Sequence, residues 1–345
     1  MKIAVVFNES FPQLTDHYSK SSSKEFKETH FYKTRGGDLI AEYQYIADLL
    51  IKAGFDSYIV NLLDDINVLF SDLVKNKPDV IFNLVEIFHE KSGLEKSFAG
   101  ILELLSIPYT GSDPIALGLC QNKNLTKRIL STYGINTPKF KLITKFSKIY
   151  RAGFDYPIIV KPAMEDASIG IENESIVFNH HELKERIEYV LTKHKQPALI
   201  EQYIEGRELN LAVIGTKNPR VLPISEIDFS EMPNTSHNIV SFQAKWDPQH
   251  ESYKKTIPIC PANLSKDIEK TAKEMAIASF KAVNCRDYAR VDMRLSKDNK
   301  LYVLEVNPNP DLSEDAGFAR SAKAAGISYK KICRLIVESA ITRKH

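Results

Sequence analysis

Short apolar segments alternate with helical patterns through the first third of the 345-residue chain. Such segments are typical of parallel strands, because helices cover both faces of a parallel sheet. The strands are expected at residues 3–7, 57–62 and 80–85, and the helices at residues 38–53 and 94–105. Gly54 follows the first of these helices as a natural stop. The alternation therefore predicts a parallel sheet with helices on both faces.

After residue 120 the pattern becomes a mixture of strands and helices. Strands are expected at residues 140–143, 156–160, 198–204, 209–214, 221–227, 289–295 and 301–306. Helices are expected at residues 123–133, 181–193, 264–283 and 329–341, and polar loops or insertions at residues 10–35 and 230–255. We expect an N-terminal α/β domain (1–119), a small central α+β domain (120–204) and a C-terminal α+β domain (205–345).

The last two expected strands, joined by a turn at residues 296–300, carry polar side chains. Because side chains alternate along a strand, Arg290 and Asp292 share one face of the first strand. Glu305 and Asn307 share a face of the second strand in the same way. If the strands pair, two carboxylates and an amide oxygen suit magnesium; otherwise they decorate a solvated hairpin. The apolar residues before Glu305 favour burial, and a buried charge needs a partner.

Several segments of the chain resemble, in order, the motifs of the ATP-grasp superfamily, above all its D-alanine–D-alanine ligase branch. These segments are residues 103–112, Lys123, residues 157–162, residues 201–208 and the paired strands 289–294 and 304–310. The resemblance covers about residues 80–340. It implies an ATP-grasp fold made of α/β and α+β domains, and an ATP-dependent ligase that joins a carboxylate to an amine.

The resemblance also implies a nucleotide site. Lys123 and Lys161 are similar to the two lysines that contact ATP phosphates, a contact that suits an ammonium group. Glu208 resembles the carboxylate that binds the ribose hydroxyls. Without the family, each of these side chains would be taken for an ordinary charge. The segment that resembles the adenine-binding hinge consists of Glu201, Gln202, Tyr203 and Ile204. The backbone groups of Gln202 and Ile204 are implied to pair with adenine.

A two-step reaction is implied by the same resemblance. The γ-phosphate passes to the carboxylate of a first substrate, and an amine then attacks the resulting acyl phosphate. Magnesium, with manganese as an alternative, is implied at Asp292, Glu305 and Asn307. Arg290 is implied to stabilise the oxyanion of the tetrahedral intermediate.

Two loops are implied to close over the phosphates. The first, residues 162–170, contains Ser168 as a candidate catalytic hydroxyl, although Asp166 and Ala167 replace a glycine and a serine of the family. The second is the polar segment 230–255, which resembles the family's lid. Lys245 in this segment is the candidate to reach the transferring phosphate.

Two departures from the family concern substrate recognition. Glu86 stands where the family has a histidine, and Asp311 stands where it has a glycine that serves the oxyanion hole. Because a buried unpaired carboxylate is costly, both residues favour an amine-bearing or cationic substrate. Glu314 and Asp315 either add to this preference or simply precede a helix, where acidic residues are favoured.

Two other functions remain open from the sequence. One is a true D-alanine–D-alanine ligase, whose complete amino-acid pocket the chain does not show. The other is a nucleotide-binding regulatory protein without catalysis. The presence of Lys123, Lys161, Asp292, Glu305 and Asn307 speaks against this second alternative.

The composition limits the partners. Lys and Arg total 46 against 44 Asp and Glu, which argues against a nucleic-acid surface, with a local basic patch as the alternative. No segment approaches the ~20 apolar residues of a membrane span, and the four cysteines lack metal-ligand spacing. We expect a cytoplasmic protein with small-molecule carboxylate and amine substrates and no nucleic-acid or membrane partner. A homodimer is implied by the resemblance alone.

Overall fold

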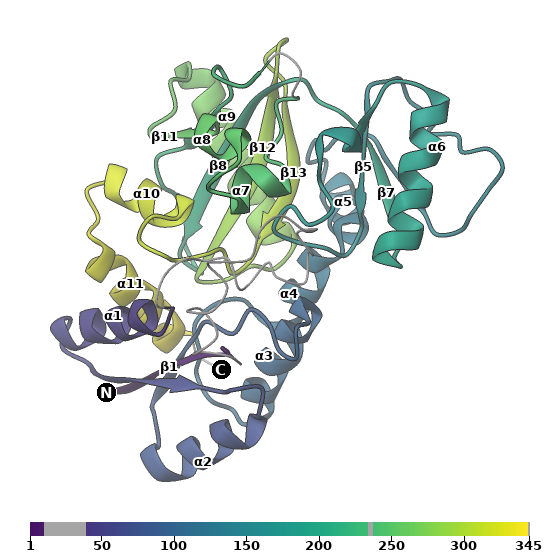
Figure 1. The fold of residues 1–345 in the computed structure, drawn as a ribbon. Coiled ribbons are helices and arrows are strands. Elements are labelled where there is room, and N and C mark those ends of the chain that lie inside the picture. Colours follow the sequence, from purple (N-terminus) through teal and green to yellow (C-terminus); the bar gives the residue numbers. More distant parts are fainter. Residues whose placement is uncertain (10–38, 234–236, 344–345) are drawn as a thin grey trace.

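The computed structural model describes residues 1–9, 39–233 and 237–343, which form three sheets (Figure 1). The polar segment expected at residues 10–35 lies outside the described residues. Among the helices of these ranges, none is long and apolar enough to span a membrane. The mixed α/β architecture agrees with the expected fold class.

The first sheet is parallel, in the order β2-β1-β3, with helices on both faces as predicted. Its elements are β1 (Lys2–Phe7), α1 (Leu39–Lys52), β2 (Asp56–Asn61), α2 (Ile66–Asn76), β3 (Val80–Asn83) and α3 (Glu95–Leu104). Ile3 and Val5 of β1 pack into a core with α1. Ala4 and Val6, which point the other way, pack into a core with α2 and α3. This alternation explains why β1 is a continuous apolar run.

The second sheet is antiparallel, in the order β4-β7-β5-β6, and α6 packs on it. Its elements are β4 (Phe140–Ile143), β5 (Ile158–Pro162), β6 (Ile176–Val177), α6 (His180–Tyr189) and β7 (Ala198–Gln202). Two helices, α4 (Pro114–Gln121) and α5 (Lys123–Thr132), connect the first sheet to this one. In Figure 1 this sheet lies to the right of the third sheet, with α6 on its outer side.

The third sheet follows the order β11-β10-β8-β12-β13, with β9 paired to β8. Its strands are β8 (Gly206–Ile214), β9 (Arg220–Val221), β10 (Ser225–Asp228), β11 (Ile257–Ile259), β12 (Tyr288–Ser296) and β13 (Leu301–Asn307). Helix α9 (Lys266–Ala282) covers one face. Ala289, Val291 and Met293 point into that core, so the alternate residues of β12 point to the opposite face.

Several elements differ from the expected pattern. The helices α2 and α4 were not predicted, and α10 (Gly317–Ala324) was one of two alternatives for the segment after Glu314 and Asp315. The strand expected at 221–227 is broken into β9 and β10, with Pro223 between them, because proline lacks the N–H that a strand ladder needs. The polar segment 230–255 contains two short helices, α7 (Phe242–Trp246) and α8 (Glu251–Lys255).

The last helix, α11 (Tyr329–Thr342), returns to the first sheet and lies beside α1 (Figure 1). Ile332, Ile336 and Val337 of α11 share a core with β1 and with α1. The C-terminal helix α11 therefore packs into the same core as β1 and α1. The domain boundaries after residues 119 and 204 stay a prediction.

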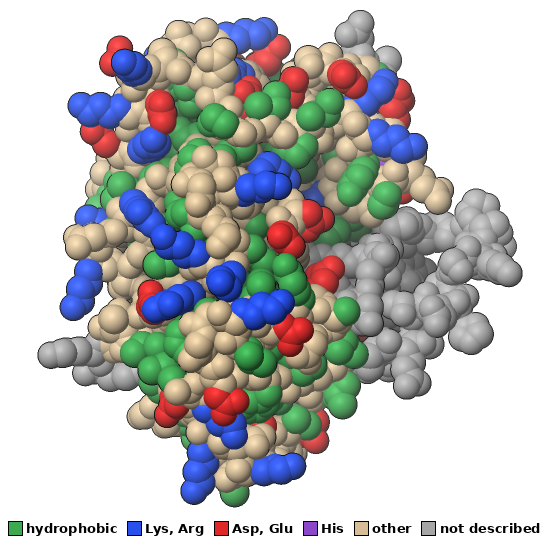
Figure 2. All heavy atoms as spheres, turned by 90° about the vertical axis from the view of Figure 1, so that its left-hand side faces the viewer, with side chains coloured by type: hydrophobic (Ala, Val, Ile, Leu, Met, Phe, Trp, Pro, Cys, Tyr) green, Lys and Arg blue, Asp and Glu red, His purple; other side chains and the backbone are tan. Residues whose placement is uncertain are grey.

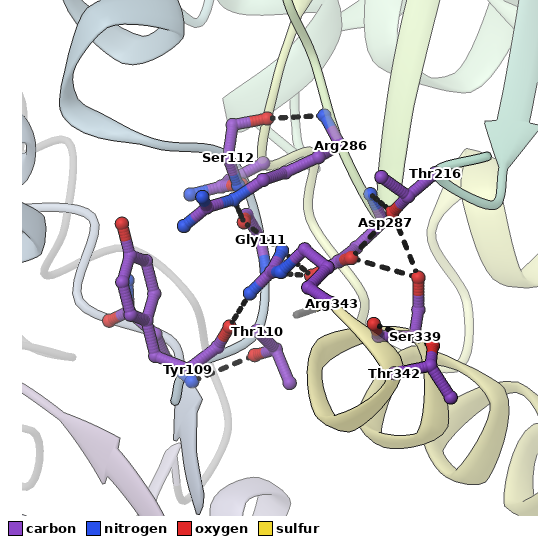
Figure 3. Close-up of polar contacts among 12 residues, drawn as sticks. Tyr109, Thr110, Gly111, Ser112, Thr216, Arg286, Asp287, Ser339, Thr342 and Arg343 are labelled. Carbon is purple, nitrogen blue, oxygen red and sulfur yellow. Dashed lines mark hydrogen bonds and ion pairs between the residues drawn. The ribbon is translucent and has the colours of Figure 1, made fainter. Parts of the chain in front are cut away.

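A buried polar cluster ties this helix to the first and third sheets (Figure 3). Asp287, fully buried just before β12, accepts hydrogen bonds from the Gly111 N–H at 2.9 Å and the Ser339 hydroxyl at 2.8 Å. It also accepts from Thr216 Oγ1 at 2.9 Å and pairs with Arg343 Nη1 at 2.5 Å. Arg343 in turn donates to the carbonyl of Tyr109. The cluster thus joins the segment after α3 to the start of β12.

On the surface, charges of both signs are mixed. Figure 2 shows Lys and Arg side chains across the middle of one face, with Asp and Glu side chains around them. The absence of a nucleic-acid partner stays a prediction.

Candidate active site

Strands β12 and β13 bring the expected acidic and amide side chains together. Asp292 lies opposite Glu305, and Arg290 lies opposite Asn307. The register shifts after Asp292, where β13 holds one extra residue, Leu304. This β-bulge is a local irregularity of the kind often found next to active sites.

Asp292 is the best-connected carboxylate of the group. Arg290 holds it with a fork of two bonds, from Nε to Oδ1 at 2.7 Å and from Nη2 to Oδ2 at 2.8 Å. Asn307 Nδ2 donates to Oδ2 at 2.9 Å, and Asn210 Nδ2 on β8 donates to Oδ1 at 2.8 Å. Four donors thus satisfy this nearly buried carboxylate and fix its orientation.

Glu305 has a different partner, the first residue of α5. Lys123 Nζ lies 2.7 Å from Glu305 Oε2. Burial alone would raise the pKa of Glu305, but Lys123, Lys161 and Arg290 outweigh it and hold the pKa below its ordinary value. Lys123 is itself buried, and its backbone N–H donates to the Ala163 carbonyl after β5. The carboxylate therefore stays ionised beside two lysines.

Lys161 is buried at the end of β5 and pairs with Glu201 of β7, with Nζ 3.0 Å from Oε2. Glu201 is also 3.2 Å from the Nζ of Lys127, a fully buried lysine on α5. Lys127 further donates to Thr137 Oγ1 at 2.9 Å. Burial lowers the pKa of Lys127 to about 8, with Lys161 nearby acting in the same direction.

Lys127 was not singled out from the sequence. It follows Lys123 by four residues on one helix, so the two side chains lie on the same face. This spacing was the available signal. The Glu201 side chain is a counter-ion between two lysines, so only its backbone remains for the expected hinge role.

The expected adenine segment continues from β7. The N–H of Gln202 donates to the Lys139 carbonyl at 2.8 Å. The Tyr203 hydroxyl donates to the Asn238 carbonyl at 3.3 Å. The N–H of Ile204 has no hydrogen-bond partner within the described residues. Of the two backbone groups expected to pair with a base, the Ile204 N–H is thus open.

Glu208 lies on β8, directly opposite Arg294 of β12. An ion pair joins Arg294 Nη2 to Glu208 Oε2 at 2.9 Å. Burial raises the pKa of Glu208, while Arg294 opposes that rise. Arg294, to which the sequence alone assigns no role, therefore orients the carboxylate that was expected to bind a ribose.

The two loops expected to cover the phosphates contact each other. Ser168 Oγ donates to the Val240 carbonyl at 2.8 Å, and Trp246 Nε1 donates to the Ala167 carbonyl at 2.9 Å. Lys245, half-buried on α7, lies near the carboxylates of β12 and β13. Burial and Arg290 lower the pKa of Lys245. The Ser168 hydroxyl thus joins the two loops. Lys245 lies near the carboxylates of Asp292 and Glu305.

The two residues expected to contact substrate, Glu86 and Asp311, lie in different surroundings. Glu86 is exposed after β3 and lines a small cavity. Asp311 does not line that cavity, and its Oδ1 accepts from the backbone N–H and the hydroxyl of Ser313. Glu314 and Asp315 precede α10, which agrees with the simpler explanation of a helix start.

The donor set fits a divalent cation. Glu305 Oε1 and Asn307 Oδ1 take part in no hydrogen bond within the described residues. At Asp292 a cation would compete with the Arg290 guanidinium, because both oxygens are already occupied. Among the described residues no three His, Cys, Asp or Glu side chains are placed to hold a metal ion together, so the set needs the Asn307 amide beside its two acids.

Comparisons with known proteins identify the family of the chain. The family model for the D-ala D-ala ligase C-terminus matches residues 129–338. The D-alanine–D-alanine ligase of Desulforamulus reducens is 32% identical over 79% of this chain and 88% of its own. That of Carboxydothermus hydrogenoformans is 33% identical over 84% and 88%.

The solved structure of D-alanine–D-alanine ligase from Bacillus anthracis complexed with ATP covers 99% of this chain and 97% of its own. Its TM-score is 0.70 and its sequence identity is 26%. A second structure from the same organism has a TM-score of 0.71. The chain therefore belongs to the D-alanine–D-alanine ligase family and is an ATP-dependent ligase with the ATP-grasp fold.

Proposed function

We propose that the chain activates a carboxylate with ATP as an acyl phosphate and joins it to an amine, with amino acids or similar compounds as substrates. The observation that carries this proposal is that basic and acidic side chains from α5, β5, β12 and β13 lie close together. Lys123 and Lys161 approach Glu305, while Arg290 holds Asp292 on the neighbouring strand. Such an arrangement can position phosphates and stabilise the charge that develops during transfer.

In this proposal ATP lies between the second and third sheets. The open N–H of Ile204 pairs with adenine, and Glu208, oriented by Arg294, accepts from the ribose hydroxyls. Lys123 and Lys161 contact the phosphates, and Lys245 reaches the phosphate that is transferred. The contact between the two loops supports this placement, because it would exclude water from an acyl phosphate.

Magnesium, or manganese, is proposed as the metal, held by Asp292, Glu305 and Asn307. When bound, it would neutralise charge on the β- and γ-phosphates. The chain's own groups then have distinct tasks. Arg290, once released from its fork on Asp292, donates hydrogen bonds to the oxyanion of the tetrahedral intermediate.

A second candidate is the joining of two D-alanine molecules. It is favoured by the names of the relatives from D. reducens and C. hydrogenoformans. Against it, Glu86 stands at the position where the resemblance places a histidine. We therefore propose an amino-acid ligase of broader class, with D-alanine among the compounds to be tested.

The test is release of ADP from ATP and magnesium, with D- and L-amino acids supplied singly and in pairs. We expect at least one pair to stimulate ADP release and to yield a dipeptide or amide detectable by mass spectrometry. Stimulation by D-alanine alone at about 1–1000 per second would select the second candidate. ADP release that no carboxylate or amine stimulates would contradict the proposal.

A further inference from the structure

Arg294 is a buried arginine on β12 that joins two parts of the candidate active site, and it is 3% exposed. Its Nη1 donates to the Gly206 carbonyl at the start of β8 at 3.0 Å, and its Nη2 lies 2.9 Å from Glu208 Oε2. The same Nη2 donates to the carbonyl of Asn238, which lies between β10 and α7. One nitrogen atom therefore links the carboxylate proposed to bind the ribose to the polar segment 230–255.

Two aromatic rings hold the guanidinium of Arg294 in this position. Its central carbon lies 5.8 Å from the centre of the Tyr203 ring and 5.6 Å from the centre of the Phe229 ring. Contacts at this range attract a cation to the face of a ring. The Tyr203 hydroxyl also donates to the Asn238 carbonyl, at 3.3 Å. That carbonyl therefore accepts from two donors, one that follows β7 and one on β12.

Residues 237–246, the strap, contain α7 and with it Lys245. The middle of the strap is fixed by the Ser168 hydroxyl, which donates to a strap carbonyl at 2.8 Å. Its end is fixed by Trp246 Nε1, which donates to the carbonyl before Ser168 at 2.9 Å. Near its start, the anchor on the third sheet is Arg294. The placement of Lys245 therefore depends on the loop that contains Ser168 and on β12.

Glu208 has one carboxylate oxygen left for a ligand. Its Oε2 pairs with Arg294, whereas its Oε1 takes part in no hydrogen bond within the part of the chain that the structure describes. Ribose hydroxyls that donate to Oε1 would fix the carboxylate from the side of the ligand. The fixed carboxylate would in turn fix Nη2 of Arg294, because a charge-assisted hydrogen bond holds its geometry. The path from a ribose to the strap thus consists of two side chains.

We propose that Arg294 is a positioning residue, which couples the ribose bound at Glu208 to the seating of the strap and so to the placement of Lys245 on the phosphate that is transferred. The inference rests on the proposed function, because it takes Glu208 as the ribose site. Arg294 acts through Glu208 and Asn238 and not on the reacting atoms. An intact ribose then contributes to kcat as well as to KM, because it seats the strap that the transfer step needs.

The nucleotide 2′,3′-dideoxy-ATP keeps the base and the phosphates of ATP and lacks both ribose hydroxyls. At saturating nucleotide we expect its kcat with wild type to lie about 10- to 100-fold below that of ATP, the effect of one charge-assisted hydrogen bond. In Arg294→Met, kcat for ATP should fall to the dideoxy value, and kcat for dideoxy-ATP should fall no further. Arg294→Lys keeps a charged donor and should retain part of the difference between the two nucleotides.

The matched control is Arg207→Met. Arg207 lies on β8 in the same sheet and pairs with Glu226 of β10, with its Nε 2.6 Å from Oε1. It also donates to the Asn263 carbonyl at 2.9 Å. These partners lie outside the strap, so this variant loses an arginine–glutamate pair of the same sheet without touching the proposed path. It should preserve the ratio of the two kcat values, even where its Tm falls.

Trp246 is the single tryptophan of the chain, so its fluorescence reports on the end of the strap. Acrylamide quenching is measured with magnesium and saturating ATP or dideoxy-ATP, without a carboxylate substrate. We expect ATP to protect Trp246 better than dideoxy-ATP does in wild type and in Arg207→Met, and both nucleotides to protect it equally in Arg294→Met. Circular dichroism checks the fold of each variant. If Arg294→Met does not fold, the wild-type comparison and Arg294→Lys decide.

Equal kcat and equal protection with the two nucleotides in wild type would overturn the coupling, while ADP release stimulated by a carboxylate and an amine would leave the proposed function standing. A loss of kcat in Arg294→Met by the same factor for both nucleotides would also overturn it, because Arg294 would then have a structural role alone. If no carboxylate and amine stimulate ADP release, the proposed function fails, and the quenching of Trp246 still decides the coupling.

Discussion

Lys127 makes the stability of this protein depend on pH in a way that can be calculated. The side chain is fully buried and lies 3.2 Å from Glu201. Its pKa of about 8 in the folded chain compares with 10.5 for an unperturbed lysine. Between these values the unfolded chain binds a proton that the folded chain has lost, so stability rises with pH. Below pH 8 both states are protonated, and the buried charge is destabilising throughout.

The size of the effect follows from the two pKa values. Burial of the charged lysine costs about 3 kcal/mol at pH 7, and about half of that remains at pH 9.5. The free energy of unfolding of wild type should therefore gain roughly 2 kcal/mol over this interval from Lys127 alone. The variant Lys127→Met removes the titrating group and should lack this gain.

Urea unfolding at pH 7, 8 and 9.5 measures the difference between wild type and Lys127→Met. We expect the wild-type free energy, relative to the variant, to rise by roughly 2 kcal/mol from pH 7 to 9.5. The control Lys148→Met, at an exposed lysine, should run parallel to wild type. A difference between wild type and Lys127→Met that is constant with pH would refute the assignment of a low pKa to Lys127.

Three further predictions concern the site and the fold. Asp292→Asn and Glu305→Gln should each reduce ADP release at least about a hundredfold, while circular dichroism shows that the fold is retained; near-normal turnover would contradict the proposed metal site. Glu208→Gln should weaken the binding of a non-hydrolysable ATP analogue about tenfold, as measured by calorimetry; an unchanged affinity would mean that the ribose binds elsewhere. Arg343→Leu removes the ion-pair partner of buried Asp287 and should lower the free energy of unfolding by roughly 3 kcal/mol; a loss under 1 kcal/mol would show that the remaining hydrogen bonds to Asp287 suffice.

The fold was predictable where the apolar pattern has a single interpretation. The runs at β1 and β3 are apolar on both faces, and the ladder of β12 and β13 follows from alternation and a short turn. Helix α4 was missed because it is short, with eight residues. Pro223 is visible in the sequence, but the apolar pattern of residues 221–227 predicts one continuous strand, which the structure divides into β9 and β10.

The site was predictable in its composition but not in its pairings. That Lys123 reaches Glu305 depends on how α5 crosses β13, a tertiary contact with no local pattern. Lys127 and Arg294 are counter-ions of Glu201 and Glu208, and the sequence shows only that they are basic. Glu86 lines a cavity to which the end of β3, α3, β12 and the segment after β13 all contribute, and these elements meet only in the fold. Pairings of this kind require the fold.

The most direct test of the account is the fate of the carboxylate oxygen. An amino acid labelled with ¹⁸O in its carboxylate is supplied with ATP, magnesium and the amine that gives the fastest ADP release, and the phosphate is examined by ³¹P NMR. Activation through an acyl phosphate predicts inorganic phosphate that carries one ¹⁸O atom for each amide formed. ADP release with unlabelled phosphate, or formation of AMP and pyrophosphate, would contradict the mechanism.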